Sequence, residues 1–247
     1  MQELEQTGNE ERWYKVTQDY WKEQPSTVDG MLGGIGEVAQ TDEEGSRAFI
    51  QRIFQRTTIP PDSRALDCGA GIGRVTIKVL ADCFQTIDVQ EQSSNFVRTF
   101  QEACPEELRP RIGMTSVSTL QDFVPTPNTY DCIWIQWVLA YLKPAHLVQC
   151  LQRCAAALKP GGFIVVKENV ARGTEMLDEQ DNYAIRFKQV WLDIFAQAGL
   201  EVRAQEAQQG FPRALFPVWF FALQPAGAPQ PPAAAAIPAT AVAVATS

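Results

Sequence analysis

Short apolar runs alternate with longer amphipathic patterns through the middle of this chain, and this alternation constrains the fold more than any other feature. Strand-like runs cover residues 64–68, 86–89, 130–136 and 162–167, and helical periodicity covers residues 73–84, 93–103 and 144–158. A repeated order of strand and helix is typical of βαβ units, whose parallel strands form a sheet covered by helices on both faces. We therefore expect an α/β fold with a mostly parallel sheet.

The segments on either side of this region extend the expected fold. Apolar residues at helical spacing predict helices over residues 10–22, 46–56 and 181–198, and late strands are expected at 201–205 and 218–223. Residues 168–179 interrupt the pattern, and Gly199 can end the last helix in the left-handed conformation. Four glycines within residues 30–36 are too many for a stable helix interior, so we expect a loop or lid there.

Chain length and composition bound the domain organisation. At 247 residues the chain is long enough for one α/β domain, which we place at residues 12–223. The polar, acidic residues 1–11 should be flexible, and the uncharged, Ala- and Pro-rich residues 224–247 should form a disordered tail. We expect neither a membrane span nor a signal peptide, because the chain has no apolar run long enough and its start lacks a basic flank.

Cysteine usage and charge indicate a compartment and exclude some partners. The six cysteines form no Cys-x-x-Cys pair, which favours reduced packing residues in a cytoplasmic and/or nuclear protein. The net charge of -8 argues against nucleic acid as the main partner, since phosphate binding needs clustered Lys and Arg. A cationic substrate fits this charge better, and we expect a monomer with no membrane partner and no bound metal.

A glycine-rich turn is the strongest single motif. Residues 67–73 read DCGAGIG, directly after an apolar strand and directly before a helix. Gly69, Gly71 and Gly73 would let the backbone pass close beneath a nucleotide-type ligand at the carboxyl end of a parallel strand. The spacing differs from the Walker and dinucleotide patterns, and three glycines without wider context could also form a plain turn.

Three motifs in register resemble those of the class I S-adenosylmethionine-dependent methyltransferases. DCGAGIG resembles motif I, YDCIW at residues 130–134 resembles the fourth strand, and LKPGGFIVV at 158–166 resembles the turn and fifth strand. The resemblance implies a Rossmann-like α/β fold with a helical N-terminal lid, and S-adenosylmethionine as the cofactor. The donor contacts that it implies are Gly69, Gly71, Gly73, Arg74, Glu91, Leu120, Gln121, Gln136 and Trp21.

Some of these donor contacts also follow from their position in the chain. Glu91, near the end of the second strand, can bind both ribose hydroxyls, with Asp88 as the fallback. Arg74 opposes the dipole of the helix that it begins, which favours binding the methionine carboxylate over a solvated helix position. Leu120 and Gln121 lie in the loop that often contacts the adenine in this superfamily, although the loop could be only a helix start.

A closer resemblance covers roughly residues 12 to 223. The strings YWK (20–22), PSTVDGMLGG (25–34), ALDCGAGIGR (65–74), LQDF (120–123), YDCIWIQWV (130–138) and KEN (167–169) are similar to those of the protein α-N-terminal methyltransferases. These enzymes methylate the α-amino group of proteins whose exposed start reads Xaa-Pro-Lys after loss of the initiator Met. The strings at 28–34 and 133–138 are the specific part of the resemblance.

The resemblance implies roles for residues outside the donor site. Asp181 matches the family's candidate general base, and Asn169 matches an amide that positions the amine. Asp178 matches a carboxylate that faces the substrate lysine. The remaining substrate contacts that it implies are Trp137, Leu32, Gly33, Tyr141 and Phe216, with Trp137 as the wall for the proline ring.

Structural alternatives exist for several of these residues. Asp178 and Asp181 could cap the helix expected after them, since Asp is favoured at helix starts. Trp137 could be plain core. Trp13 and Trp21 could form either a packed amphipathic face or a lid over the cofactor.

The chain departs from the family pattern at three positions. Tyr141 stands where the family usually has a histidine, and a phenol with a pKa of about 10 is a poor proton acceptor at neutral pH. Glu91 replaces the usual Asp, which keeps the carboxylate and lengthens its reach. Phe216 stands where a tyrosine is expected near the peptide site. The tyrosine puts the proton relay in doubt and suggests slower turnover or fewer methyl groups added.

The chemistry of amine methylation favours an α-amino acceptor. With reference pKa values of about 7.7–8.0 for α-amines and about 10.4 for lysine, roughly a tenth of α-amines but about one lysine in a few thousand is neutral at pH 7. One positioned carboxylate is then enough base. Two other functions stay open: a methyltransferase of small-molecule amines on the same fold, and a donor-binding partner protein without catalytic activity.

Overall fold

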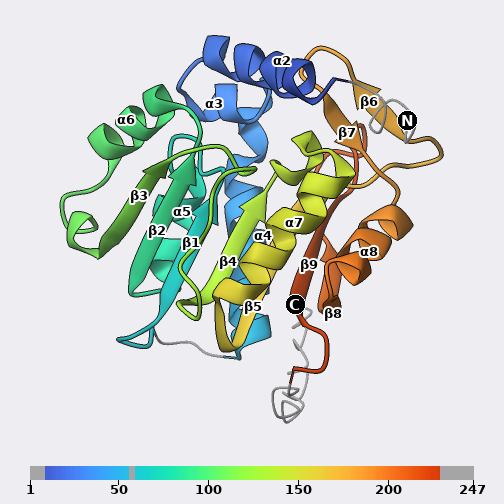
Figure 1. The fold of residues 1–247 in the computed structure, drawn as a ribbon. Helices are drawn as coiled ribbons and strands as arrows, with labels where there is room; N and C mark the ends of the chain where they lie inside the picture. Colours follow the sequence, from blue (N-terminus) through green and yellow to red (C-terminus); the bar gives the residue numbers. More distant parts are fainter. Residues whose placement is uncertain (1–8, 56–58, 229–247) are drawn as a thin grey trace, which may run out of the picture.

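A seven-stranded sheet forms the centre of the computed structural model, which describes residues 9–55 and 59–228 (Figure 1). In spatial order the strands are β3 (Ile112–Val117), β2 (Thr86–Glu91), β1 (Arg64–Cys68), β4 (Tyr130–Gln136), β5 (Leu158–Asn169), β9 (Val218–Pro225) and β8 (Leu200–Ala207). The pairs from β3 to β5 are parallel, and β9 is antiparallel to both of its neighbours. The expected mostly parallel sheet is confirmed, and its strand order reverses between β1 and β4, where ligands bind in such sheets.

Helices cover both faces of the sheet. One face carries α4 (Ala39–Phe54), α5 (Arg74–Lys78) and α6 (Ser94–Ala103), and the other carries α7 (Pro144–Ala157) and α8 (Lys188–Gln197). The alternation of side chains along β4 builds both cores, because Cys132 and Trp134 point to the first face and Ile133 and Ile135 to the second. Short 3-10 turns at η2 (Leu80–Asp82), η3 (Arg109–Arg111) and η4 (Leu139–Tyr141) connect these elements.

The N-terminal helix α2 (Glu10–Glu23) lies over the carboxyl end of the parallel strands, followed by the short α3 (Val28–Met31) and η1 (Gly36–Val38) (Figure 1). Hydrogen bonds join it to the loops beneath. Trp13 Nε1 donates to the Tyr141 carbonyl at 2.8 Å, and Thr17 Oγ1 donates to the Asp181 carbonyl at 2.7 Å. The expected helical N-terminal part is confirmed, and Trp13 belongs to its packed face.

The expectation of one helix over residues 181–198 is wrong. A hairpin of β6 (Met176–Asp178) and β7 (Tyr183–Ile185) occupies its first part, and α8 begins only at Lys188. Every side chain of β7 is buried, and the Asp181 carboxylate accepts a hydrogen bond from the Tyr183 amide at 3.0 Å, which favours a turn over a helix start. Asp178 and Asp181 therefore cap no helix.

Other boundaries also differ from those expected. Helix α4 begins at Ala39 rather than at residue 46, and the helix expected over 73–84 breaks after Lys78 into α5 and η2. Strand β3 lies at the sheet edge and all of its side chains are exposed or part-exposed, so its sequence lacks the apolar run that marks the other strands. Residues 10 and 11 belong to α2 and residues 224 and 225 to β9, whereas the rest of the expected flexible start and tail lies outside the described residues, apart from 9 and 226–228.

Two further expectations concern membrane spans and cysteines. Within the described ranges, the helices are too short or too polar to cross a membrane. All six cysteine side chains are buried, as expected for packing residues.

Candidate functional site

Two cavities lie at the carboxyl end of the parallel strands, and they adjoin each other. The first is lined by the glycine turn, the ends of β2 and β4, and helix α2; the second is lined by the β6–β7 hairpin and the loops before β9. Both cavities share Trp21, Met31, Trp137 and Tyr141 as lining residues. A group bound in one cavity can therefore meet a group bound in the other at this boundary.

The first cavity collects nearly all of the expected donor contacts. Its lining includes Trp21, Gly69, Gly71, Arg74, Glu91, Leu120, Gln121 and Gln136. Gly73 is the exception, because it starts α5 with φ 76° and a Cβ there would lie 2.1 Å from the Phe100 ring. Its glycine is required by the backbone turn and by the packing of α6.

The glycine turn keeps its shape through backbone conformation and two side chains of β2. Gly69 and Gly71 have φ of 68° and 57°, which favour glycine. The Gly69 amide donates to Gln90 Oε1 at 3.0 Å, and the Gly71 amide donates to Glu91 Oε2 at 2.9 Å. A Cβ at Gly69 would lie 2.8 Å from Val138, so a larger residue would disturb the turn.

Glu91, rather than Asp88, is placed at this cavity. The Glu91 carboxylate also accepts from the Ser93 amide at 2.8 Å, and burial raises its pKa. Asp88 binds the Arg64 side chain and accepts from the Tyr130 hydroxyl at 2.8 Å, away from the cavity lining. Asp88 therefore has a structural role and the fallback is not supported.

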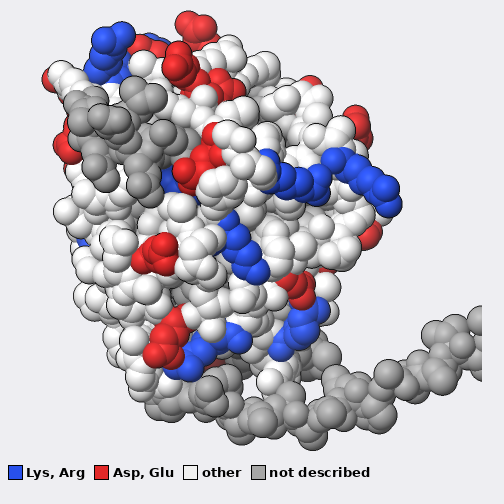
Figure 2. All heavy atoms as spheres, turned by 90° about the vertical axis from the view of Figure 1, so that its right-hand side faces the viewer, with Lys and Arg blue, Asp and Glu red and all other residues white. Residues whose placement is uncertain are grey.

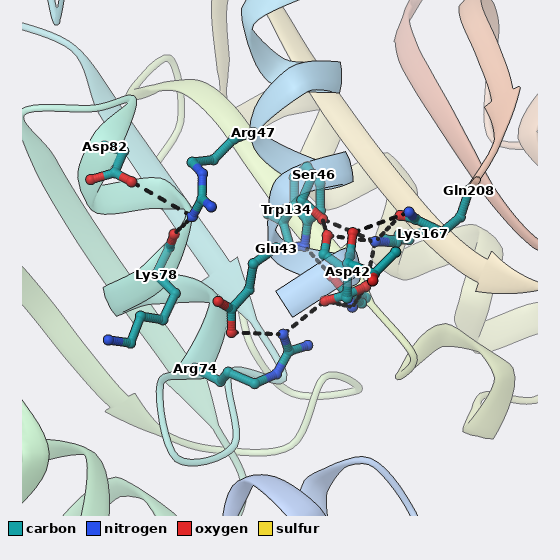
Figure 3. Close-up of polar contacts among 12 residues, drawn as sticks. Asp42, Glu43, Ser46, Arg47, Arg74, Lys78, Asp82, Trp134, Lys167 and Gln208 are labelled. Carbon is teal, nitrogen blue, oxygen red and sulfur yellow. Dashed lines mark hydrogen bonds and ion pairs between the residues drawn. The ribbon is translucent and has the colours of Figure 1, made fainter. Parts of the chain in front are cut away.

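Arg74 is buried, so it is not a solvated helix residue. Its Nη1 lies 2.7 Å from Asp42 Oδ2 and 3.5 Å from Glu43 Oε1, as Figure 3 shows. Gln136 Nε2 donates to both oxygens of the same Asp42 carboxylate, at 3.0 and 3.1 Å. Two side chains of the first cavity are thus held by one buried carboxylate that the sequence did not point to.

The second cavity collects all of the expected substrate contacts. Its lining includes Leu32, Gly33, Trp137, Tyr141, Asn169, Asp178, Asp181 and Phe216. Apolar side chains make up most of the rest, including Met176, Phe211 and Leu215. Three carboxyl or amide side chains thus stand in an otherwise mainly apolar lining, which suits a ligand with one amine and an apolar body.

Asp181 carries a carboxylate that contacts one of the residues shared by the two cavities. Its side chain is buried, and it accepts from the Tyr141 hydroxyl at 3.1 Å and from the Tyr183 amide at 3.0 Å. Burial raises the pKa of Asp181, so that this carboxyl group binds a proton more readily than an exposed one. Burial and the Asp181 charge raise the pKa of Tyr141 well above its ordinary value, and Tyr141 stays protonated.

Trp137 combines an unusual backbone with an unsatisfied side chain. It has φ 53° directly after β4, and its buried Nε1 has no hydrogen-bond partner among the described residues. Its ring lines both cavities. A buried N–H without a partner costs free energy, and strained backbones gather at functional sites. Both features set Trp137 apart from an ordinary core residue.

Several lining residues were not predicted from the sequence. Tyr14 and Thr17 of α2 line the first cavity, and Tyr183 lines the second with its hydroxyl bonded to the buried Glu168 at 2.7 Å. The helical spacing of Tyr14, Thr17 and Trp21 could have marked them as one face. The position of Tyr183 in the second cavity could not be predicted, because it depends on the β6–β7 hairpin.

Surface charge is mixed on one face of the molecule. The face in Figure 2 carries basic and acidic side chains in small interspersed groups, without a continuous basic area. Within the described ranges, no group of three or more His, Cys, Asp or Glu side chains is placed to hold a metal ion.

Comparisons with known proteins agree on one family. A family model described as AdoMet-dependent proline dimethyltransferase matches residues 9–224. The N-terminal Xaa-Pro-Lys N-methyltransferase 1-A of Xenopus laevis is 40% identical over 218 residues, covering 87% of this chain and 97% of the relative. The N-terminal Xaa-Pro-Lys N-methyltransferase 1 of Homo sapiens is 39% identical over 217 residues, with the same coverage.

Solved structures share the fold. A SAM-dependent methyltransferase of Leishmania major has a TM-score of 0.80 at 34% identity, covering 90% of this chain and 89% of that one. The 1,6-didemethyltoxoflavin-N1-methyltransferase of Burkholderia thailandensis, solved with S-adenosylhomocysteine, has a TM-score of 0.58 at 14% identity and covers 87% of this chain and 84% of that one. The second likeness concerns the fold alone.

Proposed function

This chain belongs to the family of AdoMet-dependent proline dimethyltransferases, and from this premise we propose that it methylates the α-amino group of protein N-termini that read Xaa-Pro-Lys. The observation that carries the proposal is the meeting of the two cavities. One has the lining of a methyl-donor site, and the other holds Asp181 and Asn169 beside an apolar channel. The methyl donor is S-adenosylmethionine.

The residues of the first cavity fit this donor. Gly69 and Gly71 line this cavity with backbone alone, and Glu91 can accept hydrogen bonds from the ribose hydroxyls with the lone pairs that its two amide donors leave free. Leu120 and Gln121 would contact the adenine, and Arg74 with Gln136 would hold the methionine end. When bound, the donor supplies a methyl group on a positively charged sulfur.

Asp181 is the proposed proton acceptor. The substrate nitrogen must lose a proton as its bond to the methyl carbon forms and the bond between carbon and sulfur breaks. The raised pKa of Asp181 favours this transfer, and the Tyr141 hydroxyl keeps the carboxylate pointed toward the boundary between the cavities. Asn169 would orient the amine through its side-chain amide.

The second cavity suits the peptide in two further ways. Trp137 offers an aromatic wall for a proline ring, and the exposed Asp178 offers a carboxylate for the lysine ammonium. Binding of the proline fixes the backbone before the amine reaches the donor, which lowers the entropic cost of the reaction.

Mass spectrometry of a synthetic peptide tests the proposal. A hexapeptide beginning Ser-Pro-Lys, incubated with the protein and S-adenosylmethionine, should gain the mass of one or more methyl groups. The same peptide with an acetylated N-terminus is the control and should gain none. No gain for any Xaa-Pro-Lys peptide would contradict the proposal, and binding of S-adenosylhomocysteine without turnover would favour a donor-binding protein that lacks activity.

A further inference from the structure

A buried ionic cluster lies between helix α4 and the sheet, next to the first cavity (Figure 3). It contains Asp42 and Ser46 of α4, Lys167 of β5, Arg74 of α5 and Gln208 from the segment after β8. Asp42 and Lys167 are both fully buried.

The contacts of Lys167 connect it to the cavity through one carboxylate. Its Nζ pairs closely with Asp42 Oδ1 and donates to Ser46 Oγ at 3.0 Å and to Gln208 Oε1 at 2.9 Å. Asp42 in turn holds Gln136 and Arg74, and both of these line the first cavity. Lys167 itself does not line it.

The position of Lys167 is one that an apolar residue would normally fill. Phe163 and Val165 precede it on the same face of β5 and belong to the hydrophobic core, and the Phe220 ring lies 4.3 Å from Nζ. Buried ion pairs can often be replaced by apolar residues without loss of stability. A lysine there calls for a reason other than packing.

The charges of the cluster are unequal. Two cations, Lys167 and Arg74, share the buried Asp42 carboxylate, and the nearest other carboxylate is that of the part-exposed Glu43, 3.5 Å from Arg74 Nη1. Although burial alone would raise it, Lys167 and Arg74 lower the pKa of Asp42, so Asp42 stays ionised. Among its buried members, the cluster therefore has one carboxylate for two cations and is short of negative charge.

We propose that Asp42 and Lys167 are positioning residues for the methyl donor: Asp42 orients Arg74 and Gln136, and Lys167 shares Asp42 so that the charge of Arg74 stays available to the donor carboxylate. Without Lys167, Asp42 would neutralise Arg74 alone. The inference rests on the proposed function only in that the donor occupies the first cavity. The lowered pKa of Lys167, about 8 because of burial and the nearby Arg74, is consistent with the shortage of negative charge.

Calorimetric titration with S-adenosylhomocysteine at pH 7 tests the proposal. Lys167→Met should weaken binding about tenfold, because a buried unit charge acts strongly over a few ångströms. The KM for a Ser-Pro-Lys peptide at saturating donor should stay unchanged. The double variant Asp42→Asn/Lys167→Met frees the charge of Arg74 and keeps one amide oxygen that can accept from Gln136. It should therefore bind more tightly than Lys167→Met alone, which a merely structural role would not produce.

A second variant avoids the buried core. Glu43→Gln removes the other carboxylate near Arg74, at a part-exposed position that lines neither cavity, and should tighten S-adenosylhomocysteine binding about twofold to threefold. Its matched control is Glu44→Gln, the same change of charge on the adjacent exposed residue, which should leave the affinity unchanged.

The outcomes separate this inference from the proposed function. A folded Lys167→Met protein with wild-type affinity would overturn the inference, and so would Glu43→Gln binding no tighter than Glu44→Gln. If Lys167→Met does not fold, the comparison at positions 43 and 44 decides alone. Wild-type protein that binds no S-adenosylhomocysteine would overturn the proposed function together with the inference.

Discussion

The Tyr141 hydroxyl donates a hydrogen bond to the Asp181 carboxylate at 3.1 Å, at the boundary between the two cavities. The direction of this bond fixes the roles of the two groups. Tyr141 keeps its proton, because its pKa lies well above the ordinary value, and Asp181 is left as the group that can take a proton from the substrate. Tyr141 thus orients the Asp181 carboxylate through a hydrogen bond and does not itself accept a proton.

Tyr141→His should raise turnover of a Ser-Pro-Lys peptide severalfold at pH 7, because an imidazole can both hold Asp181 and accept a proton near neutral pH. It should also shift the product toward more methyl groups per peptide. Tyr141→Phe is the control: it removes the hydrogen bond that lowers the pKa of Asp181, so the acid side of the rate profile should move to higher pH. Initial rates and product masses measure both effects. Equal rates for the two variants would remove proton acceptance at position 141 from the mechanism.

Asp181→Asn should lower turnover by about a hundredfold or more, the usual contribution of a general base. The amide can still accept from the Tyr183 backbone, so the hairpin should keep its shape. S-adenosylhomocysteine affinity, measured by calorimetry, should therefore stay at the wild-type value. Asp193→Asn, on the exposed face of α8, is the matched control and should not change either quantity. Unchanged turnover in the position-181 variant would mean that another group takes the proton.

Asp178→Asn should raise the KM for a Ser-Pro-Lys peptide about twofold to fivefold, since an exposed ion pair contributes up to about 1 kcal/mol. The same substitution should not affect a Ser-Pro-Gln peptide, which has no charge to pair. Added salt should weaken binding of the lysine peptide to wild-type protein and not to the variant. An equal rise of KM for both peptides would show that Asp178 shapes the hairpin instead of recognising the lysine.

Local patterns were enough to predict the strand and the glycine turn beside the first cavity. Strand β1 begins and ends where the apolar run does, and its glycine turn follows directly, because turn, strand and helix start are all encoded within ten residues. The secondary structure around the second cavity was predicted less well. The β6–β7 hairpin has strands of three residues, too short for a period of two to stand out, and its Asp residues resemble helix caps.

Pairings between distant segments could not be predicted at all. Asp42 and Lys167 are separated by 125 residues, and nothing near either one marks the other. Asp42 precedes the helix that was expected from residue 46, whereas in the structure α4 begins at Ala39 and Asp42 is buried. The ion pair between Asp42 and Lys167 forms only because α4 packs on the sheet.

Glu168→Gln should change how stability depends on pH. Burial raises the pKa of Glu168 from its ordinary 4.5 to about 7, although it accepts hydrogen bonds from the Leu139 amide and the Tyr183 hydroxyl. The folded state therefore binds this proton more tightly than the unfolded chain, and the resulting stability is present below pH 4.5 and lost as the pH rises to 7. The loss is about 3 kcal/mol for a shift of this size.

The glutamine variant keeps an acceptor for the Leu139 amide and does not ionise. Its free energy of unfolding relative to wild type should therefore rise by about 3 kcal/mol between pH 4.5 and 8. Urea unfolding at both pH values measures this difference, with the exposed Glu102→Gln as control. A difference that does not vary with pH would show that Glu168 does not take up a proton on folding.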